Sequence, residues 1–465
     1  MIPMTLAEIA EAVGGEVVDG PADLTVAAEA SVDSRAVAPG GLFVALPGEN
    51  VDGHDYAAAA VEAGAAAVLC ARPVGVPAVV VPDPQEGLGR LAGHVLSRLP
   101  DLTVLGVTGS QGKTSTKDLL AAVLADAGET VATAGSFNNE IGLPLTALRA
   151  TGTTRYLLLE MGARGIGHIR ELCAVAAPDV ALVLNVGKAH IGEFGGQEQI
   201  AQAKGELVEA LPDDGVAVLN ADDGAVMGMA ARTPARVLTF GESPAADVRL
   251  EELALDPDGR PRFALVHGED RVDVTLQLVG EHQAHNAAAA AAAAVAVGLD
   301  LAAVGRSLSA VQTLSQWRME VTERPDGVTV VNDAYNANPD SMRAALKALA
   351  AIGRGRGPEA RTVAVLGEMR ELGESSLEEH DAIGRLAVRL DIHQLLVVGE
   401  AARPMHLGAY LEGSWGEESV FVADNDEAVR WLRKHVRPGD VVLVKASRGA
   451  RLDEVAAALL EEGDR

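Results

Sequence analysis

The chain has 465 residues, and 66 acidic against 38 basic side chains give it a formal charge of −28. A surface this acidic repels nucleic acid and anionic lipid, so neither is expected as a partner. Apolar residues make up 48% of the chain and aromatic residues only 3%, which favours tightly packed α/β layers over an aromatic-rich β-sandwich.

The sequence has no signature of secretion or of membrane anchoring. Its two cysteines, Cys70 and Cys173, lie in apolar segments without the spacing of a disulfide framework or a metal site. The first residues lack the basic start and apolar run of a signal peptide, and the longest apolar run, 287–297, is too short to cross a bilayer. We therefore expect a cytoplasmic protein without membrane insertion, and we expect a monomer.

Residues 1–100 are predicted to form a small α/β domain. Short apolar runs indicate strands, helical spacing lies between and after them, and Leu99-Pro100-Asp101 has the composition of a linker. The expected strands are 42–46, 65–70 and 79–81, and the expected helices are 57–63 and 87–98.

Residues 101–315 are predicted to form a central domain. Strand and helix patterns alternate from residue 103, which indicates a doubly wound parallel sheet. Turn sequences at 256–259 and 267–270 predict hairpins and a small antiparallel patch, and the alanine-rich stretch from Asn286 predicts a buried helix. The expected strands are 103–107, 156–159, 180–185 and 216–219, and the expected helices begin at 114 and around 199.

Residues 316–465 are predicted to form a third, Rossmann-like α/β domain. The expected strands are 328–331, 362–366, 395–398, 420–422 and 441–444, and the expected helices are 341–350, 377–390, 426–435 and 452–460.

The strongest local signal is a phosphate-binding loop. Residues 106–117 read G-V-T-G-S-Q-G-K-T-S-T-K, between an expected strand and an expected helix. Glycines let the backbone curl so that N–H groups face phosphate oxygens, and the helix N-terminus adds partial positive charge. Lys113 is expected to reach the β- and γ-phosphates, and the Thr114 hydroxyl to help hold Mg²⁺. The predicted nucleotide-binding residues here are Gly109, Ser110, Gln111, Gly112, Lys113, Thr114 and Ser115.

Three further residues stand near the ends of expected strands or on the following helix. Glu160 ends an apolar run, so its carboxylate could face the nucleotide crevice and hold Mg²⁺, or could be an ordinary strand-end acid. His190 follows another strand, where a lone histidine is usually a packing residue. Lys204, taken alone, is typical of a solvated helix surface.

These segments together resemble the Mur ligases. The loop has the form T-G-x-x-G-K-T-x-x-K, followed by N-x-G-x-A-H at 185–190 and I-A-x-A-K-x-E at 200–206. The resemblance implies ATP as the nucleotide, a second magnesium site at His190, and carbamylation of Lys204, which would turn its ammonium into a carboxylate-like group. Lys113, Glu160, His190 and Lys204 are then the expected catalytic residues, and the last three, with Thr114, the expected metal ligands.

The resemblance extends to the substrate side. S-V-D-S-R at 31–35 is similar to the uridine-nucleotide domain of these ligases, so Ser34 and Arg35 could meet a pyrophosphate, although Arg35 could also be an ordinary surface residue. F-N-N-E-I-G at 137–142 resembles the substrate loop, in which Asn138 and Asn139 could read polar groups. Asn286 resembles a residue near the adenine, or could be a simple helix cap.

In the third domain, N-D-A-Y-N-A-N-P at 332–339 resembles the Mur ligases that add D-alanyl-D-alanine. Asn332, Asp333 and Asn336 are then expected to touch nucleotide or substrate when the domains close; a polar turn before a helix is the alternative. Arg318 is retained as a nucleotide contact, but Trp317 stands where related chains often have glycine. The K-A-S-R-G segment at 445–449 is expected to line the incoming-dipeptide or closure surface.

The resemblance implies an ATP-dependent ligase of bacterial peptidoglycan synthesis. It would activate the carboxylate of UDP-N-acetylmuramoyl-tripeptide as an acyl phosphate and join it to D-alanyl-D-alanine. The chain lacks the D-N-P-R element of the preceding amino-acid-adding ligase, which favours the dipeptide step. Another ligase of this superfamily, either the amino-acid-adding UDP-muramoyl-dipeptide ligase or folylpolyglutamate synthase, stays an alternative. So does a P-loop switch, although the chain has no N-K-x-D guanine-reading element.

Overall fold

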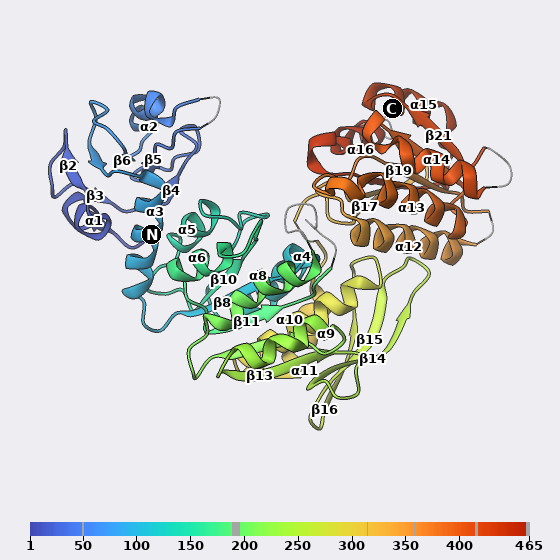
Figure 1. Cartoon of the computed structure of the whole chain (residues 1–465), viewed down its shortest axis with the longest axis horizontal. Helices are drawn as coiled ribbons and strands as arrows, with labels where there is room; N and C mark the ends of the chain where they lie inside the picture. The colour runs from blue at the N-terminus through green and yellow to red at the C-terminus, as the bar shows by residue number, and fades with distance from the viewer. Residues whose placement is uncertain (49–50, 188–195, 314, 358, 414–416, 462–465) are drawn as a thin grey trace.

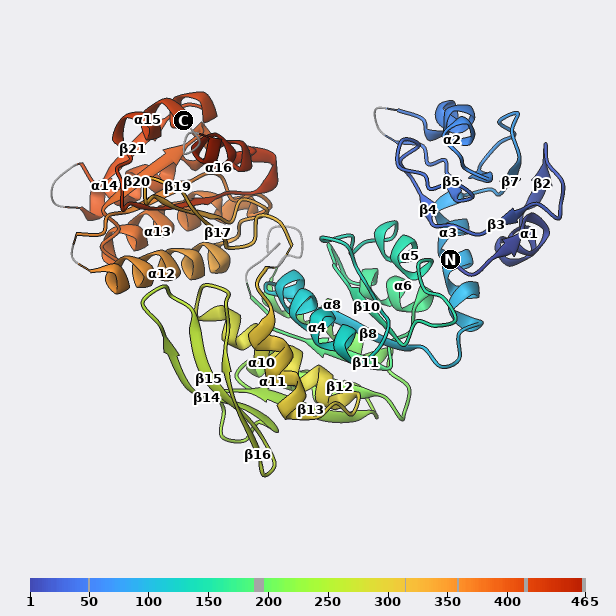
Figure 2. The same cartoon turned by 180° about the vertical axis from the view of Figure 1, so that it is seen from behind.

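The computed structural model describes residues 1–48, 51–187, 196–313, 315–357, 359–413 and 417–461. The three largest sheets of this part follow one another along the chain, and Figures 1 and 2 show them in three bodies arranged in an open V. The predicted class, α/β with three domains, is confirmed; the borders predicted at residues 100 and 315 stay predictions. No helix in these ranges is long and apolar enough to cross a membrane.

The N-terminal body combines a five-stranded sheet, a small two-stranded sheet and three α-helices. The strand order of the larger sheet is β2-β7-β6-β5-β4. Helix α3 is capped by the Asp83 side chain and packs its Leu88 and Leu91 into one core with residues of the central body. The elements are β1 Met4–Thr5, α1 Leu6–Val13, β2 Glu16–Val18, β3 Thr25–Val26, β4 Ala30–Ser31, β5 Leu42–Val44, α2 Ala57–Glu62, β6 Ala67–Cys70, β7 Ala78–Val80 and α3 Pro84–Ser97.

The central body is built on a nine-stranded sheet of order β16-β15-β14-β13-β12-β11-β8-β10-β9. Strands β8 to β14 pair in parallel, and the two predicted hairpins add β15 and β16 antiparallel to the same sheet. Its strands are β8 Thr103–Thr108, β9 Thr130–Ala132, β10 Tyr156–Glu160, β11 Val180–Val183, β12 Val216–Asn220, β13 Arg236–Gly241, β14 Val248–Leu255, β15 Pro261–His267 and β16 Asp270–Thr275.

The register of this sheet brings three strand ends to one place. Glu160 pairs beside Val107, and Val183 pairs beside Thr108, so β10 and β11 both end next to the turn that follows β8. In a parallel sheet these carboxyl ends form the crevice where ligands bind.

Helices cover both faces of the central sheet. On one face α10 brings eight fully buried alanines, 287–294, against the sheet and α4, because small side chains allow close approach. The other face is covered by α5, α6 and α8. The helices are α4 Lys113–Ala127, α5 Gly142–Ala147, α6 His168–Val175, α8 Gln197–Glu209, α9 Gly224–Met227, α10 His282–Ala296 and α11 Leu301–Ala310.

The C-terminal body has a six-stranded sheet of order β17-β18-β22-β19-β20-β21, parallel except for β17. Val279 of the central chain packs in its core with Met319 and Ile352, which joins the two bodies. The elements are β17 Glu320–Glu323, β18 Thr329–Asn332, α12 Pro339–Arg356, β19 Thr362–Leu366, α13 Ser376–Arg389, β20 Gln394–Val398, α14 Arg403–Glu412, β21 Ser419–Val422, α15 Asn425–His435, β22 Val441–Lys445 and α16 Leu452–Leu460.

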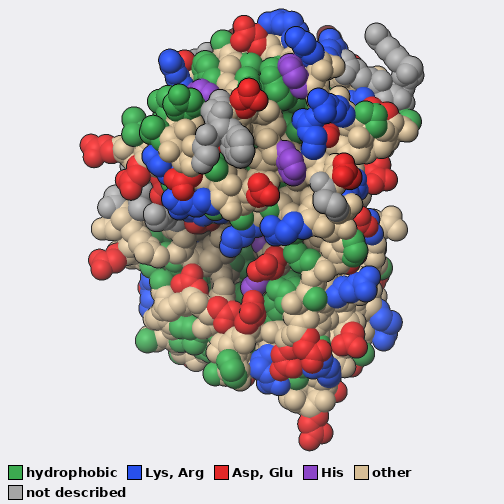
Figure 3. All heavy atoms as spheres, turned by 90° about the vertical axis from the view of Figure 1, so that its right-hand side faces the viewer, with side chains coloured by type: hydrophobic (Ala, Val, Ile, Leu, Met, Phe, Trp, Pro, Cys, Tyr) green, Lys and Arg blue, Asp and Glu red, His purple; other side chains and the backbone are tan. Residues whose placement is uncertain are grey.

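The charge of the chain is not spread as one continuous acidic field. On the face that lies to the right in Figure 1, acidic and basic side chains are interspersed (Figure 3). The net charge of −28 therefore leaves room for local basic sites.

Candidate active site

The predicted phosphate loop joins β8 to α4 and is tightly curled. Gly112 has a left-handed φ of +78°, and a Cβ on it would lie 2.6 Å from the Asn286 side-chain oxygen. Asn185, at the end of the neighbouring strand, accepts hydrogen bonds from the N–H groups of Ser110 and Gln111, both at 3.0 Å. The loop is thus held in shape from outside, with its open side at the N-terminus of a 15-residue helix.

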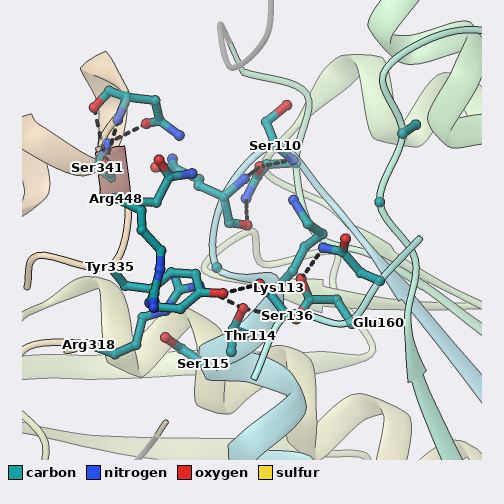
Figure 4. A pocket seen from close by; sticks show the side chains of 18 of the residues that line it. Ser110, Lys113, Thr114, Ser115, Ser136, Glu160, Arg318, Tyr335, Ser341 and Arg448 are labelled. Atoms are coloured by element: carbon teal, nitrogen blue, oxygen red, sulfur yellow. Dashed lines mark hydrogen bonds between the residues drawn. The ribbon is translucent and has the colours of Figure 1, made fainter. Parts of the chain in front are cut away.

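Lys113 and Glu160 provide opposite charges beside the loop. The Lys113 ammonium donates to the Gly109 carbonyl oxygen at 2.8 Å. Burial lowers the pKa of Lys113, Arg318 lowers it further, and Glu160 opposes both. Glu160 is only 1% exposed and accepts hydrogen bonds from the Thr114 hydroxyl (2.9 Å) and the Asn138 amide (2.7 Å). The structure therefore brings together the loop lysine, its neighbouring threonine and the strand-end acid, as Figure 4 shows.

Lys204 lies on α8 and lines the same cavity, so the alternative of a solvated surface lysine is wrong. It is 4% exposed. Burial, and then the nearby Lys113, lower the pKa of Lys204 well below its ordinary value. Burying an ammonium group beside a second cation is unfavourable, so this position favours a neutral or modified amine. His190, the fourth expected catalytic residue, lies outside the described residues.

The C-terminal body completes the wall opposite the loop. The Arg318 guanidinium donates to the Thr114 hydroxyl at 3.0 Å and lies 4.3 Å over the Tyr335 ring. The Tyr335 hydroxyl forms a hydrogen bond with Ser136 of the central body. Two contacts therefore link the C-terminal body to the central body, and one of them is at the phosphate loop.

Asp333 and Lys445 form a buried ion pair at the strand ends of the C-terminal sheet. Their side chains meet at 2.6 Å, and the same ammonium donates to the Asn336 carbonyl oxygen at 2.9 Å. Burial lowers the pKa of Lys445, and Asp333 opposes that shift. Asn332 is turned toward its own backbone, accepting from the Ala334 N–H, and does not line the cavity.

One cavity of about 980 Å³ joins these groups. It extends from the phosphate loop to the N-terminal body, from which Gln85 lines it. The residues predicted for the site that line this cavity are Ser110, Gln111, Gly112, Lys113, Thr114, Ser115, Asn138, Asn139, Glu160, Lys204, Asn286, Arg318, Asp333 and Asn336. A site of this size with charged groups converging from two bodies can hold a large polar ligand.

Two residues predicted for the substrate lie outside the cavity, and one of the two alternatives for Asn286 is excluded. Ser34 and Arg35 do not line the cavity; Arg35 is an exposed residue bound to Asp33 at 2.8 Å, and it lowers the pKa of that carboxyl to about 2. Asn286 lies inside α10, which begins at His282, so the helix-cap alternative is wrong. Its side-chain oxygen instead approaches Gly112 of the loop.

Sequence reasoning missed several residues that shape the site. Asn185 had a usable signal, because it follows a parallel strand adjacent to the loop. Ser136 had none, since its partner Tyr335 is 199 residues away. Lys117 is buried and donates to the Thr133 and Gly135 carbonyl oxygens, which fixes the segment that carries Ser136.

Comparison with known proteins assigns the family. Family models match at residues 29–94 (Mur ligase family, catalytic domain), 107–294 (Mur ligase middle domain) and 317–448 (Mur ligase, glutamate ligase domain). The UDP-N-acetylmuramoyl-tripeptide–D-alanyl-D-alanine ligase of Mycobacterium bovis is 51% identical, covering 99% of this chain and 98% of the relative. The Escherichia coli protein of that name is 35% identical, with all of both chains covered.

Solved structures agree with this assignment. A crystal structure of MurF from Acinetobacter baumannii has a TM-score of 0.88 and 31% identity, with 99% of each chain covered. The Thermotoga maritima MurF ligase, solved in complex with ADP, has a TM-score of 0.79 and 30% identity over 94% of this chain and 98% of that one. The chain is an enzyme that belongs to the Mur ligase family.

Proposed function

We propose that this chain is an ATP-dependent ligase that joins D-alanyl-D-alanine to UDP-N-acetylmuramoyl-tripeptide, giving the pentapeptide precursor of peptidoglycan, ADP and phosphate. One observation carries the proposal: the phosphate loop, Glu160 and Arg318 converge on a single cavity that reaches the N-terminal body. A long substrate can therefore span the cavity and present its carboxylate beside a bound triphosphate. The names of the full-length relatives support the choice of substrates.

The chemistry has two steps. A carboxylate oxygen of the tripeptide attacks the γ-phosphorus, the bond to the bridging β-phosphate oxygen breaks, and ADP leaves. The dipeptide amine then attacks the carbonyl carbon of the acyl phosphate, loses a proton, and phosphate leaves as the amide forms. The backbone N–H groups of the loop and the Lys113 ammonium bind the phosphates, and Arg318 adds a second cation from the opposite wall.

Magnesium fits the donors present beside the loop. Within the described ranges, three His, Cys, Asp or Glu side chains do not gather anywhere as a metal site. Mg²⁺, however, commonly keeps water molecules and binds through one or two protein oxygens plus phosphate oxygens. Thr114 and Glu160 supply such oxygens, and a carbamylated Lys204 would supply another. The ion would neutralise charge on the phosphoryl oxygens.

Positioning is the main contribution of the protein, because three ligands must meet between separate bodies. The half-buried loop and the contacts from the C-terminal body would keep water away from the acyl phosphate. We also infer a cytoplasmic location and a monomeric state.

A phosphate-release assay tests the proposal. Purified chain with ATP and Mg²⁺ is given UDP-N-acetylmuramoyl-tripeptide, D-alanyl-D-alanine, both or neither, and products are identified by mass spectrometry. We expect sustained release, and pentapeptide product, only with both. Phosphate release that is indifferent to both substrates would contradict the ligase assignment and favour a nucleotide switch. Release with another amine but not with the dipeptide would favour another ligase of the family.

A further inference from the structure

The backbone on either side of Arg318 adopts conformations that residues with side chains rarely take. Trp317 has a φ of +59° and Met319 a φ of +49°. Such left-handed conformations are unfavourable for any residue except glycine, and they persist only where the surroundings determine them strongly. They cluster at functional sites, so the bonds that hold this segment need to be identified.

Backbone hydrogen bonds pin the segment to the turn after β18. The Trp317 N–H donates to the Glu320 carboxylate at 3.2 Å, and its carbonyl oxygen accepts from the Tyr335 N–H at 3.3 Å. The Met319 N–H donates to the Asp333 carboxylate at 3.1 Å. The polypeptide on both sides of Arg318 is therefore fixed within the C-terminal body.

The side chains add a stack of alternating rings and guanidinium groups. Arg448 lies 4.6 Å over the Trp317 ring and 5.4 Å over the Tyr335 ring, and Arg318 lies 4.3 Å over Tyr335. Figure 4 shows Arg448, Tyr335 and Arg318 side by side at the cavity wall. Each cation is attracted to the aromatic face over which it lies. Removing one ring therefore loosens the guanidinium above it and, through that group, the rest of the stack.

The end of the stack reaches the phosphate loop. Arg318 donates to the Thr114 hydroxyl at 3.0 Å, whereas its Nε atom is buried with no hydrogen-bond partner within the described residues. Within the described residues the guanidinium is thus held by stacking and by one hydrogen bond to the other body, and a guanidinium has further N–H donors for an acceptor that arrives with the ligand. A phosphate oxygen has that chemistry.

We propose that Trp317 is a positioning residue for the ligation reaction. Its ring, acting through Arg448 and Tyr335, fixes the Arg318 guanidinium at Thr114, so that the transferring phosphoryl group meets a donor already in place. The inference rests on the proposed function. Tryptophan occupies a position whose backbone conformation suits glycine, and its ring makes a contact with Arg448 that glycine cannot make.

The test compares Trp317→Gly, Trp317→Ala and Trp317→Phe, with Trp431→Phe as the matched control. Trp431 is also stacked, 4.3 Å from His435, but His435 does not line the cavity, whereas Arg448, the partner of Trp317, does. We expect kcat/KM for ATP to fall on the order of tenfold for the Gly and Ala variants, since small misplacements of a reacting group carry such costs. The Phe variant should stay within about threefold, because a ring is kept.

Two readouts separate positioning from a purely structural role. The thermal unfolding midpoint of Trp317→Gly should equal or exceed that of Trp317→Ala, because glycine accepts the left-handed backbone. In an Arg318→Ala background, Trp317→Ala should cause little further loss of kcat/KM, since both act through the same guanidinium.

The proposal is overturned if the Gly and Ala variants keep wild-type kcat/KM, if Phe loses as much as Ala, or if the losses at Trp317 and Arg318 are additive. Failure of the proposed function would give a different result, because the wild-type protein would then form no pentapeptide with both substrates present.

Discussion

Two buried lysines at the cavity, one in each large sheet domain, have opposite surroundings. Lys445 of the C-terminal body is 2% exposed and has a carboxylate partner, Asp333, and a carbonyl partner. Lys204 of the central body is 4% exposed, and the charge that acts on it is a second lysine, Lys113. The pKa of both is lowered by burial, but only Lys445 has an opposing carboxylate.

The charge of Lys445 is balanced by a protein carboxylate, whereas the positive charge around Lys204 is balanced only when a ligand or a modification adds negative charge. The C-terminal pair is neutral as a whole, so its role is to hold the turn that carries Tyr335 and Asn336. The central wall has an excess of positive charge, which a triphosphate or a carbamate would neutralise. A chain with a net charge of −28 can therefore bind a highly anionic ligand, because the local field at the cavity differs from the global one.

The largest expected effect comes from breaking the satisfied pair. Asp333→Asn leaves Lys445 buried without a counter-charge, which should lower the free energy of unfolding by about 3 kcal/mol. Urea denaturation followed by circular dichroism measures this. Adding Lys445→Met to the same chain removes the stranded cation and should recover part of the loss. A single variant as stable as the wild type would show that Lys445 is not dependent on Asp333.

Removing charge from the central wall should affect chemistry rather than stability. Lys113→Ala should lower turnover by about 10²-fold or more, by analogy with other preorganised charge contacts. The control is Lys117→Met, four residues along the same helix. Its ammonium is bound by two carbonyl oxygens and by the Asp118 carboxylate at 2.7 Å, so stability should fall instead. Near-normal ligation by Lys113→Ala would remove the basis for assigning this loop to the triphosphate.

A variant of Lys204 tests whether this buried lysine is modified. Lys204→Met should leave the unfolding midpoint unchanged or higher, because a buried charge is lost, and should lower turnover roughly tenfold. The lowered pKa of Lys204 enlarges the fraction of neutral amine, which is the form that reacts with carbon dioxide. Isotope-labelled bicarbonate should therefore give a carbamate carbon signal by NMR that Lys204→Met lacks. Full activity without any such signal would rule the modification out.

The sequence was sufficient for features that depend on local chemistry. The phosphate loop, the strand-end position of Glu160 and both hairpin turns could be predicted, because glycine, lysine and alternating apolar residues constrain the nearby backbone. The parallel pairing of β13 with β14, which makes the antiparallel strands part of the central sheet, could not. That pairing depends on which sheet edge is available, and no local pattern encodes it.

The rest of the site depends on contacts between distant segments. The sequence around Lys204, taken alone, is typical of a surface lysine. In the fold Lys204 is buried, because α8 packs with this side chain toward the cavity that the phosphate loop also lines. Arg318 was expected to touch the nucleotide, but its stack with Tyr335 and Arg448 joins segments more than a hundred residues apart along the chain. Arg35 was expected near a pyrophosphate and stays an untested prediction, since it lies exposed beside Asp33.

The smallest effect concerns His282, which lies at the start of α10 and lines the cavity. Burial lowers the pKa of His282 to about 4 from an ordinary 6.5; Asp333 opposes this, and Lys445 and His285 add to it. Between pH 4 and pH 6.5 the unfolded chain therefore binds more protons than the folded chain. The free energy of unfolding therefore decreases as the pH falls from 6.5 toward 4.

The loss attributable to His282 should be less than about 1 kcal/mol between neutral pH and roughly pH 6, measured as the shift of the urea midpoint. His282→Gln should flatten this dependence, whereas His285→Gln should keep it, because His285 is half-exposed and paired with Glu242 at 2.7 Å. If His282→Gln keeps the wild-type slope, then the histidine does not experience the positive field of the cavity. The excess cationic charge would in that case be confined to the phosphate loop and Lys204.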